Sequence, residues 1–148
     1  MKRTFVLLIL SVISIAVVRA GDVSVKVTMA TEVEGESTNT FAPDTEKIYA
    51  LFKTKGAKSG DKIRAVLIAE DVGDVAPANT KVLDKTIDME GDTEDGDFNF
   101  SKPTKGWPAG KYRVDVYVNE DLVTTAKFTV KAVAKKKSSS DEEEESGD

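Results

Sequence analysis

Histidine and cysteine are both missing from the 148 residues of this chain. The absence of histidine excludes histidine general bases, histidine metal ligands and histidine-based pH switching near neutrality. The absence of cysteine excludes disulfides and lipid attachment through an N-terminal cysteine, so the stability of the fold must come from its core alone. Copper and zinc sites are disfavoured as well, because only two methionines follow residue 20.

An excess of positive charge is also missing. The full chain has a net charge of −5 at pH 7. After residue 20 there remain 18 basic and 26 acidic residues, which give a net charge of −8. Nucleic acids and anionic membrane surfaces are bound through an excess of Lys and Arg, so we expect neither as a primary partner.

The first 20 residues have the composition of a secretory signal peptide. Positive charge in Met1–Arg3 precedes the apolar run Phe5–Val18, and a small-residue cleavage site, Val18–Ala20, precedes Gly21. The apolar run is shorter than the roughly 20 residues of a membrane-spanning helix. We therefore predict export to the periplasm or the medium, with cleavage and without membrane insertion afterwards.

The rest of the chain divides into a domain and a tail, predicted over residues 21–131 and 132–148. The tail holds three lysines, a run of serines and six acidic residues, a composition that cannot support a packed core. We expect it to be disordered and prefer a solubilising role to phosphorylation of its serines.

Short segments of alternating or continuous apolar residues, separated by turn-forming residues, recur through the domain. Alternation with a period of two is typical of half-buried strands, and no convincing amphipathic helix interrupts it. Regularly spaced short strands indicate an all-β, antiparallel sandwich or barrel. Seven strands are predicted, at 22–33, 46–53, 62–70, 80–87 (near an edge), 98–100 and two within 106–130.

The clearest segment, Gly106–Val130, is a turn followed by a strand, a hairpin at Asn119–Asp121 and a second strand. One face of its first strand is apolar, and the second strand continues that face. The shared face comprises Tyr112, Val114, Val116, Val118, Ala126, Phe128 and Val130. The opposite face comprises Arg113, Asp115 and Tyr117.

This segment resembles the last two strands of bacterial immunoglobulin-like and fibronectin-III-like accessory domains. The residues that carry the resemblance are Gly106-Trp107-Pro108-Ala109-Gly110-Lys111-Tyr112, with Phe128-Thr129-Val130 at the end. The resemblance implies a seven-stranded immunoglobulin-like sandwich, with structural roles for Trp107, Pro108, Gly110, Tyr112 and Phe128. It also implies a tyrosine corner, in which Tyr112 is buried and its hydroxyl bonds to the backbone upstream. It implies no particular activity.

Catalysis and metal binding have little support in the sequence. A serine or threonine nucleophile would have only carboxylates or lysines as bases, and no nucleophile-elbow motif is present, so we expect no enzyme and no cofactor. A cluster of carboxylates within 88–97 is a weak candidate for calcium, but it departs from the EF-hand spacing, and a solvated loop is our preferred interpretation. The candidates are Asp88, Glu90, Asp92, Glu94, Asp95 and Asp97.

Apolar side chains outside the main alternating face are candidates for a partner surface. Val66, Ile68 and Tyr117 belong to this group, although we prefer to interpret them as covered by neighbouring parts of the sheet. Trp107 is expected to close one end of the sandwich rather than to stack on a ligand.

The predicted function is non-covalent binding of another protein at the cell envelope or outside the cell. Alternatives are an inhibitor of a secreted hydrolase acting through the loop Asp71–Asn79, and a calcium- or cation-binding module. A functional surface is expected on that loop, on the acidic segment or on the tail.

Overall fold

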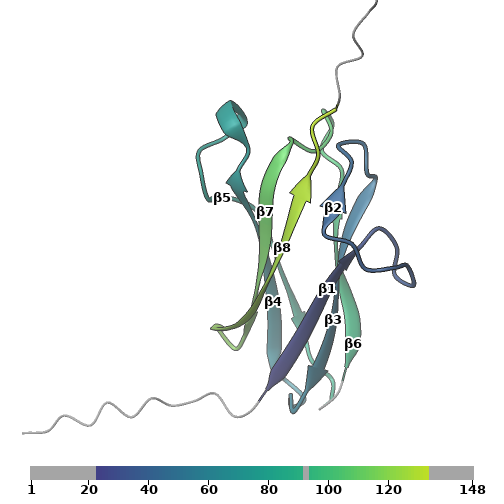
Figure 1. The fold of residues 1–148 in the computed structure, drawn as a ribbon. Coiled ribbons are helices and arrows are strands. Elements are labelled where there is room, and N and C mark those ends of the chain that lie inside the picture. The colour runs from purple at the N-terminus through teal and green to yellow at the C-terminus, as the bar shows by residue number, and fades with distance from the viewer. Residues whose placement is uncertain (1–22, 92–93, 134–148) are drawn as a thin grey trace, which may run out of the picture.

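The computed structural model describes residues 23–91 and 94–133 of the chain. They form eight strands and one short 3-10 helix, η1, arranged in two sheets that pack face to face (Figure 1). The elements are β1 (Ser24–Ala30), β2 (Thr40–Phe41), β3 (Lys47–Lys55), β4 (Lys62–Asp71), η1 (Gly73–Val75), β5 (Thr80–Asp88), β6 (Asp95–Ser101), β7 (Gly110–Val118) and β8 (Asp121–Val130).

The order of the strands is that of an immunoglobulin-like sandwich. One sheet has the order β1-β3-β6 and the other the order β2-β8-β7-β4-β5. In the lettering of immunoglobulin domains the first sheet corresponds to A, B and E, and β8-β7-β4-β5 corresponds to G, F, C and C′. The all-β sandwich expected from the sequence is therefore confirmed.

The core lies between the two sheets and is built by the strand alternation seen in the sequence. Tyr112, Val114, Val116 and Val118 of β7 are all buried. Ala126 and Phe128 of β8 stand opposite Val114 and Tyr112, as the shared face requires. The other sheet adds large apolar residues, so side chains of both sheets fill one cluster without a disulfide. The three-stranded sheet contributes Ile48, Phe52, Phe98 and Phe100 to this cluster.

The structure departs from the predicted seven antiparallel strands in having an eighth strand and one parallel pairing. The additional strand is β2, whose two residues pair parallel with Thr129 and Val130 of β8. Phe41 of this strand is buried against Phe128, with the two ring centroids 5.4 Å apart. A two-residue strand is too short to show any periodicity, so the alternation could not reveal it.

The acidic segment is also less of a loop than predicted. Residues 95–97 belong to β6 and pair with residues 51–53 of β3. Asp95 and Asp97 lie on the outer face of β6, and Gly96 between them lies on the inner face. A Cβ at Gly96 would lie 2.5 Å from the Phe52 ring, so glycine occupies the inward position where an apolar residue would have marked a strand.

The N-terminal strand is shorter than the predicted 22–33 segment, because it ends at Ala30 and a turn follows. The predicted signal peptide lies outside the described residues, and so does the tail apart from Ala132 and Val133. No helix within residues 23–91 and 94–133 has the length and apolar character needed to cross a membrane.

The hairpin between β7 and β8 is tighter than the three residues predicted for it. Asn119 and Glu120 form the turn, both with positive φ, at 47° and 74°, and Asp121 already belongs to β8. Two positive φ values are typical of a type I′ hairpin turn, in which glycine is preferred at the second position. Glu120 therefore adopts a conformation that costs a non-glycine residue free energy.

We expect Glu120→Gly to raise the free energy of unfolding by about 0.5 to 1 kcal/mol, because glycine removes the strain at positive φ. Asp121→Gly, one residue further into β8, is the control and should lower stability by a similar amount. Urea unfolding measures both changes. A lower midpoint for Glu120→Gly would show that the turn is not strained.

Candidate functional site

An apolar pocket of about 430 Å³ opens at the end of the sandwich that carries η1. We call it the end pocket. Its walls are the segment Val72–Ala76, the start of β5 and the turn Pro103–Pro108, and its lining is almost entirely apolar. Trp107 and Tyr112 contribute to the lining, and Val75 is 68% exposed beside it.

A chain of aromatic rings supports the end pocket from the core. Trp107 meets Tyr112 edge-on with centroids 6.2 Å apart, and Tyr112 stacks on Phe128 at 5.1 Å. The indole nitrogen of Trp107 donates a hydrogen bond to the Thr45 carbonyl at 2.8 Å. The lining is therefore a fixed part of the core, because its aromatic members are held by packing and by directed hydrogen bonds.

Tyr112 has the geometry of the tyrosine corner that the family resemblance implies. Its side chain is 2% exposed, and its hydroxyl donates to the Pro108 carbonyl at 2.7 Å. Burial raises the pKa of Tyr112 to about 12. Trp107 and Tyr112 were expected to close the core and not to face a ligand; they do line the core, and they also line the end pocket.

Gly110 lies where the turn before β7 approaches the loop after β4. This residue has a φ of 151°, and a Cβ on it would lie 2.1 Å from the Asp71 carbonyl oxygen. The turn before β7 can therefore contact the loop after β4 only because residue 110 has no side chain.

The loop Asp71–Asn79 is held at its base. The backbone N–H of Asn79 donates to the Glu70 carbonyl at 3.2 Å, and Arg113 of β7 donates to the Asn79 side-chain oxygen at 2.7 Å. Arg113 also bonds to Glu70 and Asp115, at 3.2 and 3.1 Å. The loop is therefore braced from the outer face of the sheet, which keeps one wall of the end pocket in place.

The edge strand β5 starts at the end pocket, since Thr80 and Val82 are among the lining residues. Three of its apolar side chains are 38–40% exposed, namely Val82, Leu83 and Ile87. Arg64 of β4 clamps the strand by two hydrogen bonds to the carboxylate of Asp84, at 2.7 and 2.5 Å. The end pocket and this exposed edge form one continuous surface. The sequence predicted a strand near an edge at 80–87, but it did not predict the pocket.

The Arg64–Asp84 contact should make the free energy of unfolding depend on pH in the acidic range. Hydrogen bonding from Arg64 lowers the pKa of Asp84 from 3.8 to about 2. A depressed pKa in the folded state stabilises the fold above the unfolded value, and the contribution is lost as the pH falls through 3.8 toward 2.

We therefore expect wild type to exceed Asp84→Asn in stability at pH 6, and the difference to shrink steadily as the pH falls from 3.8 toward 2. Urea unfolding of both proteins across this range gives the comparison, with Asp74→Asn of the exposed η1 turn as the control. A difference that stays constant with pH would contradict the assigned pKa.

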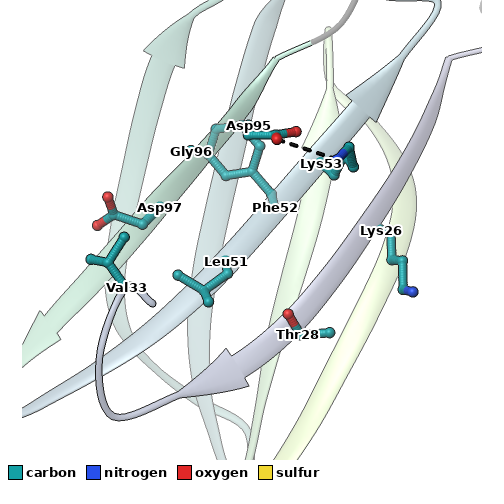
Figure 2. A pocket seen from close by; sticks show the side chains of 9 residues that line it. All are labelled: Lys26, Thr28, Val33, Leu51, Phe52, Lys53, Asp95, Gly96 and Asp97. Carbon is teal, nitrogen blue, oxygen red and sulfur yellow. Dashed lines mark ion pairs between the residues drawn. The ribbon is translucent and has the colours of Figure 1, made fainter. Parts of the chain in front are cut away.

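A second hollow lies on the outer face of the three-stranded sheet. Figure 2 shows Leu51 at its centre, with Val33 and Thr28 nearby and the Lys53–Asp95 ion pair at one side. The ion pair is 3.3 Å long and both side chains are 66% exposed, so it contributes little free energy. This hollow mixes charges of both signs with a few apolar side chains and defines no specific ligand chemistry.

The candidate carboxylates of the acidic segment are not brought together. Within residues 23–91 and 94–133 no three acidic residues are placed to hold a metal ion. Asp88 pairs with Lys62 and Asp95 with Lys53. Glu94 accepts a hydrogen bond from the Glu90 backbone, Asp97 accepts one from Asn99, and Asp92 lies outside the described residues.

The apolar residues considered for a partner surface lie on the outer face of the five-stranded sheet. Val66 is only 5% exposed there, and the guanidinium of Arg64 lies 5.4 Å from the Tyr117 ring centroid. Asp115 accepts hydrogen bonds from Arg113 and from Thr125, the latter at 2.9 Å. This face carries a network of hydrogen-bonded polar and charged groups. The expectation that these apolar residues are covered by neighbouring parts of the sheet is confirmed for Val66.

Comparison with known proteins supports the fold and no further property. No protein-family model and no curated protein matches the chain. An alkylpurine DNA glycosylase from Pseudomonas fluorescens, bound to DNA, aligns with a TM-score of 0.53 and 15% identity over 74% of this chain and 30% of its own. A β-glucosidase from Listeria innocua in complex with gluconolactone aligns with a TM-score of 0.51 and 11% identity over 75% and 16%.

These likenesses show the fold alone. The chain spans less than a third of either enzyme, so their activities are not transferred to it. An immunoglobulin-like protein from Pseudomonas aeruginosa also aligns, with a TM-score of 0.46 and 17% identity over 75% of this chain and 93% of its own.

Proposed function

We propose that this chain is an exported, non-catalytic module that binds another protein through the end pocket. The observation that carries the proposal is the junction of an apolar pocket with an exposed sheet edge. Among described residues, β5 pairs with β4 alone, so the backbone groups on its other side are free to meet a polypeptide. A small apolar molecule would use the pocket and leave these backbone groups unused.

The size and chemistry of the end pocket define what it takes. A volume of about 430 Å³ is at the lower end for ligand pockets and matches one or two large side chains. An apolar lining with few polar groups selects an aliphatic or aromatic side chain over a sugar or a charged group. The composition of residues 1–20 supports export of the module, and an exported module would meet its partner at the envelope or outside the cell.

Capture from envelope extract of the producing cells tests the proposal. Wild type, Val75→Asp and Val33→Asp are immobilised, and the retained proteins are identified and quantified. Val75 and Val33 are matched, because both are exposed valines outside the strands, at 68% and 54%, and Val33 lies in the turn after β1, beside the hollow on the three-stranded sheet. A partner should be retained by wild type and Val33→Asp and reduced about tenfold or more on Val75→Asp, because the carboxylate would be buried against an apolar side chain.

If wild type and both variants retained the same set of proteins, the end pocket would be ruled out as the docking site. Titration calorimetry of any retained protein against the three variants then gives the ratio of affinities directly.

A further inference from the structure

We infer that the partner contributes an extended segment that pairs with β5 as a ninth strand and places an apolar side chain in the end pocket. The inference rests on the proposed function and specifies its partner. It further assigns the segment to a different protein rather than to a second copy of this chain.

The length of β5 distinguishes it from the other sheet edges. The four edge strands are β1, β2, β5 and β6. Strand β2 has two residues, and β1 and β6 have seven each, whereas β5 has nine. The end of β1 is also covered, because Ala30 bridges to Ser37 and Thr38 donates to the Met29 carbonyl at 2.8 Å.

The inward side chains of β5 are incompletely covered. Leu83 stands opposite Leu67 and Ile87 opposite Ile63 in the β4 pairing, so all four side chains share the core face. Leu67 and Ile63 are fully buried, yet Leu83 is 38% and Ile87 39% exposed. An added strand with apolar residues on the same face would cover them, which is the cross-strand packing that stabilises sheets.

The charges of β5 are paired within the domain, so they do not repel an incoming strand that places neutral residues opposite them. Exposed edges are commonly protected by lysines that repel an incoming strand. Here Lys85 donates to the Asn99 carbonyl of β6 and lies 5.7 Å from the Phe100 ring centroid. Asp84 is held by Arg64 and, at 3.4 Å, by Lys81.

A second copy is a poor occupant for this edge. A two-fold axis perpendicular to the sheet would pair β5 antiparallel with β5 of a second copy and leave the same face of both strands toward the core. The numbers of any two residues that stand opposite each other then add to an even sum. The three registers that overlap seven or nine residues of β5 then oppose Lys81 with Lys85, Asp84 with Asp84, or Lys85 with Lys85. Like charges directly opposite each other destabilise a sheet, so the extended pairings disfavour self-association.

The partner segment therefore has a definable chemistry. It is extended, carries apolar side chains at alternate positions facing Leu83 and Ile87, and ends beside Thr80 with an aliphatic or aromatic residue in the end pocket. Backbone hydrogen bonds supply affinity and the pocket supplies selectivity, as in other sheets that bind peptides by strand addition.

A library of random 12-residue peptides displayed on phage is the probe. Peptides selected on the full chain are synthesised, and hydrogen exchange of the chain is measured with and without them. Amides within Thr80–Asp88 should exchange at least about tenfold more slowly in the complex, because the added strand satisfies the outer backbone groups. The double variant Leu83→Lys and Ile87→Lys, and separately Val75→Asp, should each lose about tenfold or more in affinity, while Val33→Asp binds as wild type.

Each other result overturns the inference. Peptides that depend on Val75 but leave the exchange of β5 unchanged would reject strand addition and leave the proposed function standing. Peptides that bind independently of Val75 and of β5 would reject both. Protection of β5 that appears without peptide and rises with protein concentration, together with a dimer in sedimentation, would make a second copy the occupant. Tighter peptide binding after truncation at Val133 would assign the edge to this chain's own C-terminal residues.

Discussion

Gly110→Ala should lower the free energy of unfolding by at least about 3 kcal/mol, a large fraction of the stability of a small domain. The new methyl group would lie 2.1 Å from the Asp71 carbonyl oxygen and 2.9 Å from the Val72 Cα, and both are backbone atoms that cannot rotate away. The φ of 151° adds strain of its own. Urea unfolding measures the loss.

Gly60→Ala is the matched control. Gly60 also has a positive φ, of 90°, but a Cβ there meets no atom within 4 Å. Its substitution therefore reports the conformational cost alone, about 1 kcal/mol. If Gly110→Ala proved no worse than Gly60→Ala, the contact between the turn and the Asp71 loop would not be as close as described.

Tyr112→Ala should cost about 3 to 5 kcal/mol, because it removes a buried ring that packs on both Trp107 and Phe128. Tyr112→Phe keeps the ring and removes only the hydroxyl that bonds to Pro108, so about 1 to 2 kcal/mol is expected. Urea unfolding separates the packing contribution from that of the hydrogen bond.

Tyr117 provides the comparison on the same strand. Its ring lies on the outer face beside Arg64, and Tyr117→Phe should change stability by no more than about 0.5 kcal/mol. Trp107 is the single tryptophan of the chain, so its emission also reports whether each Tyr112 variant disturbs the end pocket. Equal losses of stability for Tyr112→Phe and Tyr117→Phe would contradict the assignment of Tyr112 as a tyrosine corner.

The sequence was most informative where one side of a strand is uniformly apolar. The alternation from Tyr112 to Val118 predicted both the strand and its buried face, because burial on one side of a sheet imposes a period of two. It failed at β2, which is too short for any period, and at Gly96, where the inward position is empty to admit the Phe52 ring.

The end pocket could not be predicted in this way. Its walls come from the loop after β4, the start of β5 and the turn before β7, and only the folded sandwich brings these segments together. The signal that was available is the pair Val75 and Trp107, large apolar residues in segments predicted to be a loop and a turn. The loop Asp71–Asn79 was among the expected functional surfaces, and the acidic segment does not gather its described carboxylates into a site.

In the proposed function, the core and the binding surface share residues. Trp107 and Tyr112 stabilise one end of the core and present their remaining surface to the end pocket. Arg113 and Gly110 fix the loop that forms the opposite wall. Such a surface is organised before a partner arrives, which reduces the entropy lost on binding.

Photo-crosslinking in the producing cells tests whether the edge beside the end pocket contacts another protein. A benzophenone amino acid is placed at Val82, on the edge of β5 beside the end pocket, and in a second variant at Val33, in the turn after β1 beside the other sheet. The account predicts a crosslinked product with another protein from position 82 and none from position 33. A product from position 33 alone, or the same product from both positions, would contradict it.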